Sequence, residues 1–276
     1  MNEFGFSEFS VGSVIGRAWT VLWQKPLAFF GITLLSTILS AIVSVVIGAL
    51  LLLLASFVPI IAVVIGGFAQ GLSVLLISAL FQGALVYAIF MLLLYGTASV
   101  GEAFQRSANR VVDVILATII ISFVFVLIIG VPTIVGALLS KASSGLGVFV
   151  IIIGVIIGIV FMVIFGIKWS VTAPACVIER TGPLESLNRS SELTEGYRGQ
   201  IFGVFLLIGI VVIIFNSVAM YIASAIFGAG LLGRGFATLL TTIPFTYINI
   251  LPAVIYYSLR IRKENLTPES LADIFD

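Results

Sequence analysis

The side chains that could carry chemistry are few, and the acidic ones lie in polar segments or at the edges of apolar ones. Glu185, Glu192 and Glu195 are close enough in sequence to coordinate a cation together, but acidic residues on a solvated helix more often act as solubilising charge. Asp113 is the one carboxylate that could enter an apolar segment, and we expect it in the first turn of a helix, facing lipid headgroups.

Two residue types that often perform catalysis or bind metal are absent or scarce. The chain has no histidine, the commonest acid–base group. Its single cysteine, Cys176, allows neither an intrachain disulfide nor a Cys/His metal cage, and we expect it to be a small apolar filler inside a span. Because a catalytic site needs a positioned acid, base, nucleophile or metal, we expect no enzyme, no cofactor and no metal site.

One polar phrase occurs twice in the chain. The stretch GEAFQRSANR at residues 101–110 is followed 83 positions later by LESLNRSSEL at 184–193, which places Arg106 opposite Arg189. The stretch SVGSVIGRAW at 10–19 extends the match, because its Arg17 aligns with Arg106. The three arginines mark three similar short segments.

Each arginine is expected on a short amphipathic helix, since apolar residues recur around it at helical spacing. Such a helix can lie in the headgroup layer with its apolar face down and Arg17, Arg106 or Arg189 reaching lipid phosphate. The alternative is that the three arginines converge on a central axis and form a cytoplasmic ring or vestibule.

The third short helix differs from the other two. Gly182 and Pro183 predict its start, with proline at the first helical position and Glu185 in the first turn, and Gly196 can end it in a left-handed conformation. Its inner face is polar, so we expect it to pack against protein instead of lipid; that face carries Ser186, Ser190, Ser191 and Thr194.

Composition identifies the surroundings of these helices as lipid. Of 276 residues, 61% are apolar and 9% are charged, against roughly 25% charged in soluble domains. No charged residue occurs between Leu27 and Gly96, and about 20 apolar residues suffice to cross a bilayer. The net charge of +1 and the lack of a basic patch exclude a nucleic-acid partner.

The apolar runs predict an all-α, polytopic membrane protein with six transmembrane helices. The expected spans lie near residues 27–55, 70–96, 113–138, 147–178, 200–228 and 235–260. Pro59 and the pair Gly66-Gly67 are expected to interrupt a helix within 56–70, which would be a hairpin tip or a re-entrant piece.

Charge placement predicts the orientation. With six spans, eleven of the thirteen lysines and arginines fall on one side, and only Lys141 and Arg234 fall on the other. By the positive-inside rule the crowded side is cytoplasmic, so both termini are expected in the cytoplasm. A seventh span through 56–70 would put Arg17 and Lys25 opposite the rest.

Three parallel repeats of a short helix plus a hairpin account for this sidedness. Their approximate bounds are 10–98, 99–181 and 182–262, within one membrane domain spanning 1–262. The returning helices carry a similar dipeptide after each arginine: Gly83-Ala84, Pro174-Ala175 and Pro252-Ala253. Residues 263–276 form an acidic cytoplasmic tail with a predicted short helix.

A few polar residues lie inside the spans. Asn216, Thr241 and Asn249 are the candidates for lining a site between the hairpins. Interhelical hydrogen bonds are the simpler role for such residues, and each contributes on average about 0.6 kcal/mol.

Residues 174–203 resemble a bacterial family. The likeness is to the polytopic membrane domain that precedes the catalytic barrel of some glycerophosphoryl diester phosphodiesterases and also occurs alone in inner-membrane proteins. It is carried by Ile178-Glu179, Gly182-Pro183, Arg189-Ser190, Glu192-Leu193-Thr194 and Gly196. The usual tryptophan of the family's Arg-Ser-Trp-Glu-Leu run is Ser191 here, and the barrel with its metal residues is missing, so diesterase activity is not implied.

These observations predict a non-enzymatic protein of the bacterial inner membrane. We expect a lipid-interacting or accessory, scaffold-type subunit that presents residues 179–199 to the cytoplasm. Its partners would be membrane lipids and another membrane protein or a second copy of itself. The alternative is a transporter or channel for an uncharged or lipid-like substrate held between the hairpins.

Overall fold

The computed structural model describes residues 9–55, 58–97, 99–141, 143–228 and 230–264. Helices make up most of this part of the chain, and no strand occurs in it. In chain order they are α1 (Val11–Gln24), α2 (Pro26–Ala55), α3 (Pro59–Tyr95), α4 (Val100–Ala108), α5 (Val111–Leu139), α6 (Ser144–Lys168), α7 (Thr172–Glu179), α8 (Pro183–Thr194), α9 (Arg198–Phe227) and α10 (Leu231–Glu264). The predicted tail helix in 263–276 lies outside the described residues apart from Lys263 and Glu264, which continue α10.

Six stretches of the described chain are long and apolar enough to cross a membrane. They are Pro26–Ala55, Gly66–Tyr95, Val111–Leu139, Ser144–Glu179, Arg198–Phe227 and Leu232–Glu264. Each contains an 18-residue window whose mean hydropathy is between 1.5 and 3.4. The chain is therefore an all-helical, multi-pass membrane protein, as its composition predicted.

The predicted interruption at Gly66-Gly67 is wrong, whereas the one at Pro59 is confirmed, since α2 ends at Ala55 and a new helix starts at Pro59. Helix α3 begins at Pro59 and passes through Gly66 and Gly67 without a break. Proline is tolerated at the first helical position because its missing N–H would have no partner there. Gly66 faces α2, where an added Cβ would lie 2.5 Å from Leu51 Cδ1, so this glycine permits close packing of the two helices.

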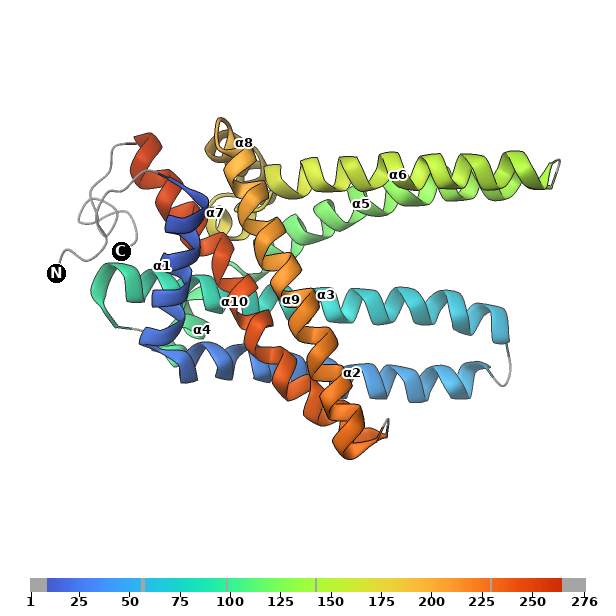
Figure 1. The fold of residues 1–276 in the computed structure, drawn as a ribbon, viewed down its shortest axis with the longest axis horizontal. Helices are drawn as coiled ribbons and strands as arrows, with labels where there is room; N and C mark the ends of the chain where they lie inside the picture. Colours follow the sequence, from blue (N-terminus) through green and yellow to red (C-terminus); the bar gives the residue numbers. More distant parts are fainter. Residues whose placement is uncertain (1–8, 56–57, 98, 142, 229, 265–276) are drawn as a thin grey trace.

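The predicted single span 147–178 is divided into α6 and α7. Pro174 contributes to the break at residues 169–171, because it has no N–H and its ring conflicts with the carbonyl of Ser170, four residues earlier. The helix therefore ends at Lys168 and restarts at Thr172, with Pro174 in the first turn. Helix α7 turns away from α6 into the middle of the molecule (Figure 1).

The short helices α1, α4 and α8 each precede a pair of long helices, and each packs against the previous pair. Helix α4 contacts α3, and α8 contacts α7, α5 and α6. The cycle closes at the ends of the chain, because α1 contacts α9 and α10. All three short helices lie at one end of the molecule, from which the hairpins α2–α3 and α5–α6 extend separately, while α9–α10 crosses obliquely (Figure 1).

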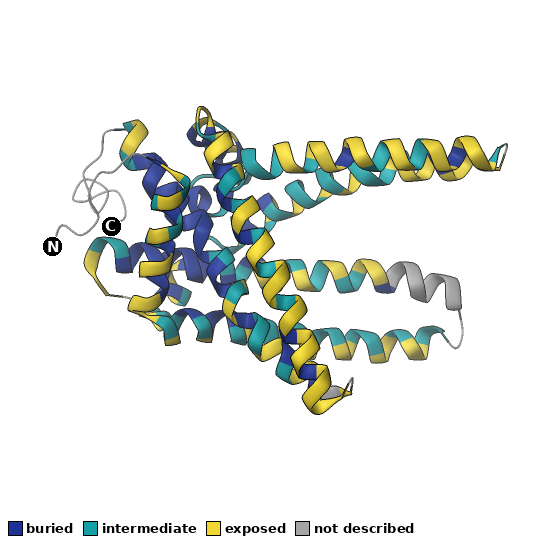
Figure 2. Ribbon diagram, viewed as in Figure 1, coloured by how far each residue is buried: buried dark blue, intermediate teal, exposed yellow. Residues whose placement is uncertain are grey.

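The buried core lies at the end that holds the short helices (Figure 2). Three segments form its centre: residues 84–92 of α3, 171–178 at α7 and 250–260 of α10, nearly all of them buried. The distal parts of the hairpins expose large apolar side chains, with Leu52 of α2 76% exposed and Phe123 of α5 62% exposed. This division fits a protein whose hairpins are solvated by lipid.

Candidate functional site

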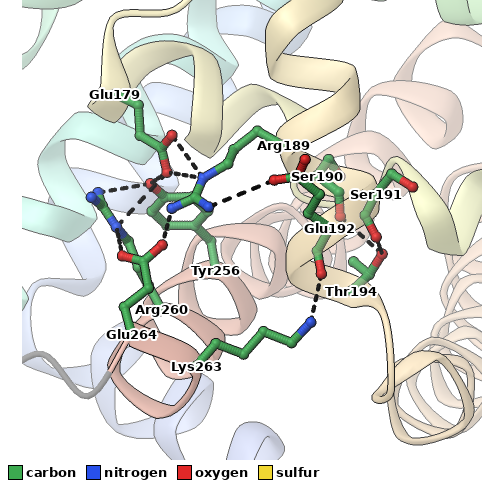
Figure 3. Close-up of polar contacts among 10 residues, drawn as sticks. All are labelled: Glu179, Arg189, Ser190, Ser191, Glu192, Thr194, Tyr256, Arg260, Lys263 and Glu264. Atoms are coloured by element: carbon green, nitrogen blue, oxygen red, sulfur yellow. Dashed lines mark hydrogen bonds and ion pairs between the residues drawn. The ribbon is translucent and has the colours of Figure 1, made fainter.

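The most concentrated polar cluster joins α7, α8 and α10 at the buried end of the molecule (Figure 3). Its central members are Glu179 at the end of α7, Arg189 in the middle of α8, and Tyr256, Arg260 and Glu264 along one face of α10. We call these five residues the ion-pair cluster.

Glu179 is the acceptor at the centre of the cluster. Arg189 Nε donates to its two carboxylate oxygens at 2.8 and 2.9 Å, and the Tyr256 hydroxyl donates to Oε1 at 2.6 Å. A single carboxylate thereby connects three helices. The Glu179 side chain is 13% exposed.

Glu264 completes the cluster from the end of α10. It accepts hydrogen bonds from Arg189 Nη2 and from Arg260 Nε, the latter at 2.9 Å. Arg260 also donates to the Tyr256 hydroxyl at 3.0 Å and is 7% exposed in its side chain.

The charges within the ion-pair cluster balance, since two arginines face two glutamates. Burial alone would lower the pKa of Arg189, but its hydrogen bonds to Glu179 and Glu264 outweigh this effect and raise the pKa well above its ordinary value. Arg189 therefore stays charged, and the cluster holds α7, α8 and α10 together through charge-assisted hydrogen bonds.

Helix α8 also satisfies the backbone groups that the break between α6 and α7 leaves open. Ser190 Oγ donates to the Lys168 carbonyl at 2.9 Å and accepts from the Val171 N–H at 3.3 Å. Thr194 Oγ1 lies 3.3 Å from the same Lys168 carbonyl. Ser186, Ser190 and Thr194 are fully buried, so the serine-rich face of α8 packs against protein as predicted, although Ser191 is only partly buried.

The remaining residues of the predicted cytoplasmic motif shape α8. Gly182 caps it, Pro183 is its first residue and Glu185 lies in the first turn, all as predicted. Gly196 follows its end with a φ of 83°, in the left-handed region that favours glycine. The outer face is exposed and acidic, and the Glu192 carbonyl there accepts a 2.5 Å hydrogen bond from Lys263 Nζ.

Arg17 of α1, Arg106 of α4 and Arg189 of α8 each contact a different returning segment. Arg17 Nη1 donates to Ser258 of α10 at 3.1 Å. Arg106 pairs with Glu102 at 3.1 Å and lies 5.9 Å from the ring centre of Tyr87 in α3. With Arg189 bound to α7 and α10, each arginine contacts the preceding unit.

The apolar face of α1 is covered by protein. In α1 this face consists of Val14, Ala18, Val21 and Leu22, all buried. The expectation that such a face rests on lipid therefore does not describe α1, whose exposed side instead carries Trp19 and Trp23, each 56% exposed.

The intramembrane candidates Asn216, Thr241 and Asn249 line neither the groove between α5 and α6 nor the pocket at the end of α4. Thr241 donates to the Thr238 carbonyl at 3.1 Å and Asn249 to the Phe245 carbonyl at 2.9 Å, each within α10. Asn216 of α9 differs, because its Oδ1 is buried without a hydrogen-bond partner in the described part of the chain.

Two cavities of the described chain differ in polarity. The first, of about 480 Å³, is an open apolar groove between α5 and α6 beside Pro132, Gly154 and Gly158. Gly154 and Gly158 permit close packing there, since an added Cβ at Gly154 would lie 2.2 Å from Pro132. The second, of about 260 Å³, is lined by Tyr87, Arg106, Asn109, Arg110, Val177 and Arg180.

The described residues hold no candidate group of metal ligands, and the comparisons with known proteins give no relative. Among the described residues, no three histidine, cysteine, aspartate or glutamate side chains are grouped closely enough to hold a metal ion. Comparisons of the chain with protein-family models, with curated proteins and with solved structures found no match.

Sequence reasoning identified Glu179 and Arg189 but missed Tyr256, Arg260 and Glu264. These three residues recur at intervals of four, which places them on one face of a helix. That spacing of two charged residues and a phenol at the end of an apolar segment was the signal that could have found them.

Proposed function

We propose that this chain is a non-catalytic integral protein of the bacterial inner membrane that interacts with lipids through its hairpins and presents its polar end to the cytoplasm. The observation that carries the proposal is the division between the two ends. Most charged groups of the described chain lie in the end built from α1, α4, α7, α8 and the last turns of α10, whereas the distal hairpins expose apolar side chains (Figure 2).

The ion-pair cluster supports a structural role for the conspicuous polar motif. Each of its four charged groups contacts an oppositely charged partner, and together they join three helices. The charged residues of the motif that resembles the phosphodiesterase-associated membrane domain thus hold α7, α8 and α10 together. This use is consistent with membership of that family as a stand-alone membrane protein.

Two features favour three repeated units about an axis along the membrane normal. The short helices pack in a cyclic order, each on the preceding hairpin. The buried positions also correspond: the third residue before and the first after each arginine are Val14 and Ala18, Ala103 and Ser107, and Ser186 and Ser190.

A role as a transporter or channel for an uncharged or lipid-like substrate is the second candidate. Asn216 favours it, because a buried amide oxygen without a partner is costly inside a membrane and is retained where it is used. This role predicts that Asn216→Leu abolishes movement of a solute or lipid across vesicles.

Reconstitution into vesicles of phosphatidylethanolamine and phosphatidylglycerol tests both candidates. The proposal predicts that the protein immobilises a fraction of spin-labelled lipid while lipid composition and an encapsulated dye remain unchanged over hours. Formation of cleaved lipid would contradict the non-catalytic role. Protein-dependent dye leakage or lipid scrambling that Asn216→Leu removes would favour the second candidate, and protein-free vesicles are the control.

A further inference from the structure

A small arginine-lined pocket lies apart from the ion-pair cluster, where α3, the end of α4 and the end of α7 meet. Tyr87 comes from α3, Arg106 and Asn109 from the end of α4, Arg110 from the turn before α5, and Arg180 from the residue after α7. Its volume is about 260 Å³. We call it the arginine pocket.

The charges around the arginine pocket favour an anion. Three guanidinium groups line it and no carboxylate does. The nearest paired carboxylates are Glu102, 3.1 Å from Arg106, and Asp113, 3.4 Å from Arg110. Both pairs are partly exposed, and such pairs are weak enough to be exchanged for a ligand.

The backbone at Arg180 indicates that its side chain is used. Arg180 has a φ of 58° and a ψ of 31°, in the left-handed region, and no other non-glycine residue in the described chain has a positive φ. Glycine adopts this conformation without the steric conflict that a Cβ introduces. An arginine where a glycine would fit better points to a function for the guanidinium.

The chemistry of the lining identifies the class of ligand. Guanidinium groups bind phosphate oxygens through paired N–H donors, while the Tyr87 hydroxyl and the Asn109 amide add donors of their own. The volume is below the roughly 300–1,000 Å³ of pockets for drug-sized molecules, so a single phosphate group with its nearest substituent fits better than a nucleotide.

We propose that the arginine pocket binds a phosphate group, supplied either by a phospholipid headgroup or by a free phosphate compound. The lipid source rests on the proposed function, because it needs a protein embedded in lipid with this end at the headgroup layer. Binding of free phosphate does not need it. Both sources would be recognised through the same phosphate oxygens, and the relative affinities of a free phosphate and a short phospholipid distinguish them.

The test measures the melting temperature of the full chain in mild detergent as inorganic phosphate or dihexanoyl phosphatidic acid is titrated in. Sodium chloride at matched ionic strength is the reference. Both probes are expected to raise the melting temperature of the wild type with saturation, as binding to the folded state requires. Affinity at least tenfold higher for the short lipid assigns the site to headgroups, and equal or lower affinity assigns it to free phosphate.

The variant Arg180→Gly removes the guanidinium and relieves the backbone, so it should fold as well as the wild type and bind phosphate at least tenfold more weakly. Arg110→Gln is a second variant with the same expected loss. Arg198→Gln, which removes an exposed arginine at the start of α9, should bind like the wild type. The phosphate site would be overturned if neither probe raised the melting temperature of the wild type more than sodium chloride does. It would also be overturned if the melting temperature of Arg180→Gly rose as much as that of the wild type.

Failure of the phosphate site is distinguishable from failure of the proposed function. Lipid immobilisation by the hairpins in vesicles should be unchanged in Arg180→Gly, since the exposed apolar surface lies elsewhere. If immobilisation is absent in the wild type while phosphate still binds, the lipid role fails and the arginine pocket stands.

Discussion

Glu179 and Arg189 are ten residues apart in sequence, and Arg189 Nε lies 2.8 and 2.9 Å from the two carboxylate oxygens of Glu179. This contact closes the turn between α7 and α8. It also positions Arg189 to reach Glu264 at the end of α10, 75 residues further along the chain. The local pair thus becomes the connection between the second hairpin and the third.

Removing either member of this pair is expected to destabilise the fold. Glu179→Gln and Arg189→Gln should each lower the free energy of unfolding by about 3 kcal/mol, because each leaves an uncompensated charge in a largely buried place. The double variant should lose less than the sum of the two single losses. Denaturant unfolding in detergent measures all three values.

The matched control is Glu195→Gln, which removes an exposed carboxylate near the end of α8 and should change stability by less than about 0.5 kcal/mol. Strictly additive losses in the double variant would contradict a direct pair between Glu179 and Arg189.

Ser190 should matter far more than its neighbour Ser191. Ser190→Ala removes the hydroxyl that serves the Lys168 carbonyl and the Val171 N–H, so it should cost about 1–3 kcal/mol. Ser191→Ala removes a hydroxyl from a partly exposed position and should cost less than about 0.5 kcal/mol. Equal stabilities of the two variants would show that α8 does not cap the break between α6 and α7.

Two glycines near the start of α6 should respond to alanine in opposite directions. An added Cβ at Gly147 would lie 2.6 Å from the Gly136 carbonyl oxygen of α5, so Gly147→Ala should destabilise the hairpin by about 1–3 kcal/mol. Gly145 has open space, and Gly145→Ala should stabilise its helix by up to about 1 kcal/mol. Thermal melts of both variants measure the difference, and a shared sign would contradict the tight α5–α6 contact.

The docking of α1 on the last hairpin can be tested through Tyr247. Its hydroxyl donates to the Ile15 carbonyl at 2.8 Å, which joins the two ends of the chain. Tyr247→Phe should lower stability by about 1 kcal/mol. Tyr221, which is 75% exposed on α9, supplies the control, and Tyr221→Phe should leave stability within about 0.5 kcal/mol. Unchanged stability of Tyr247→Phe would mean that α1 is not held in this way.

The six spans could be predicted from sequence because lipid imposes one requirement on each, a run of about 20 apolar residues. The inward face of α8 could also be predicted, since Ser186, Ser190 and Thr194 make a poor surface for lipid. These inferences depend on composition within a short window. Contacts such as Arg189 with Glu264 depend on the fold of the whole chain, so no local pattern reveals them.

The break after Lys168 shows why local rules were insufficient. Pro174-Ala175 and Pro252-Ala253 are the same dipeptide, yet α10 runs through the second one. The neighbouring short helix supplies the difference. Helix α8 offers Ser190 and Thr194 to the backbone groups that a break exposes, whereas α1 has Ala18 and Leu22 at the corresponding distances from its arginine. An opened α10 would leave its backbone groups without partners.

The orientation of the three short helices is the central claim, and site-specific labelling tests it most directly. In a Cys176→Ala background, Thr20→Cys, Gln105→Cys and Asn188→Cys place one exposed thiol on each of α1, α4 and α8, and Lys141→Cys places one at the opposite end. With a membrane-impermeant thiol reagent on spheroplasts and inverted vesicles, the account predicts that the first three react only from the cytoplasmic side and residue 141 only from outside. Labelling that divides the first three positions between the two faces would contradict it.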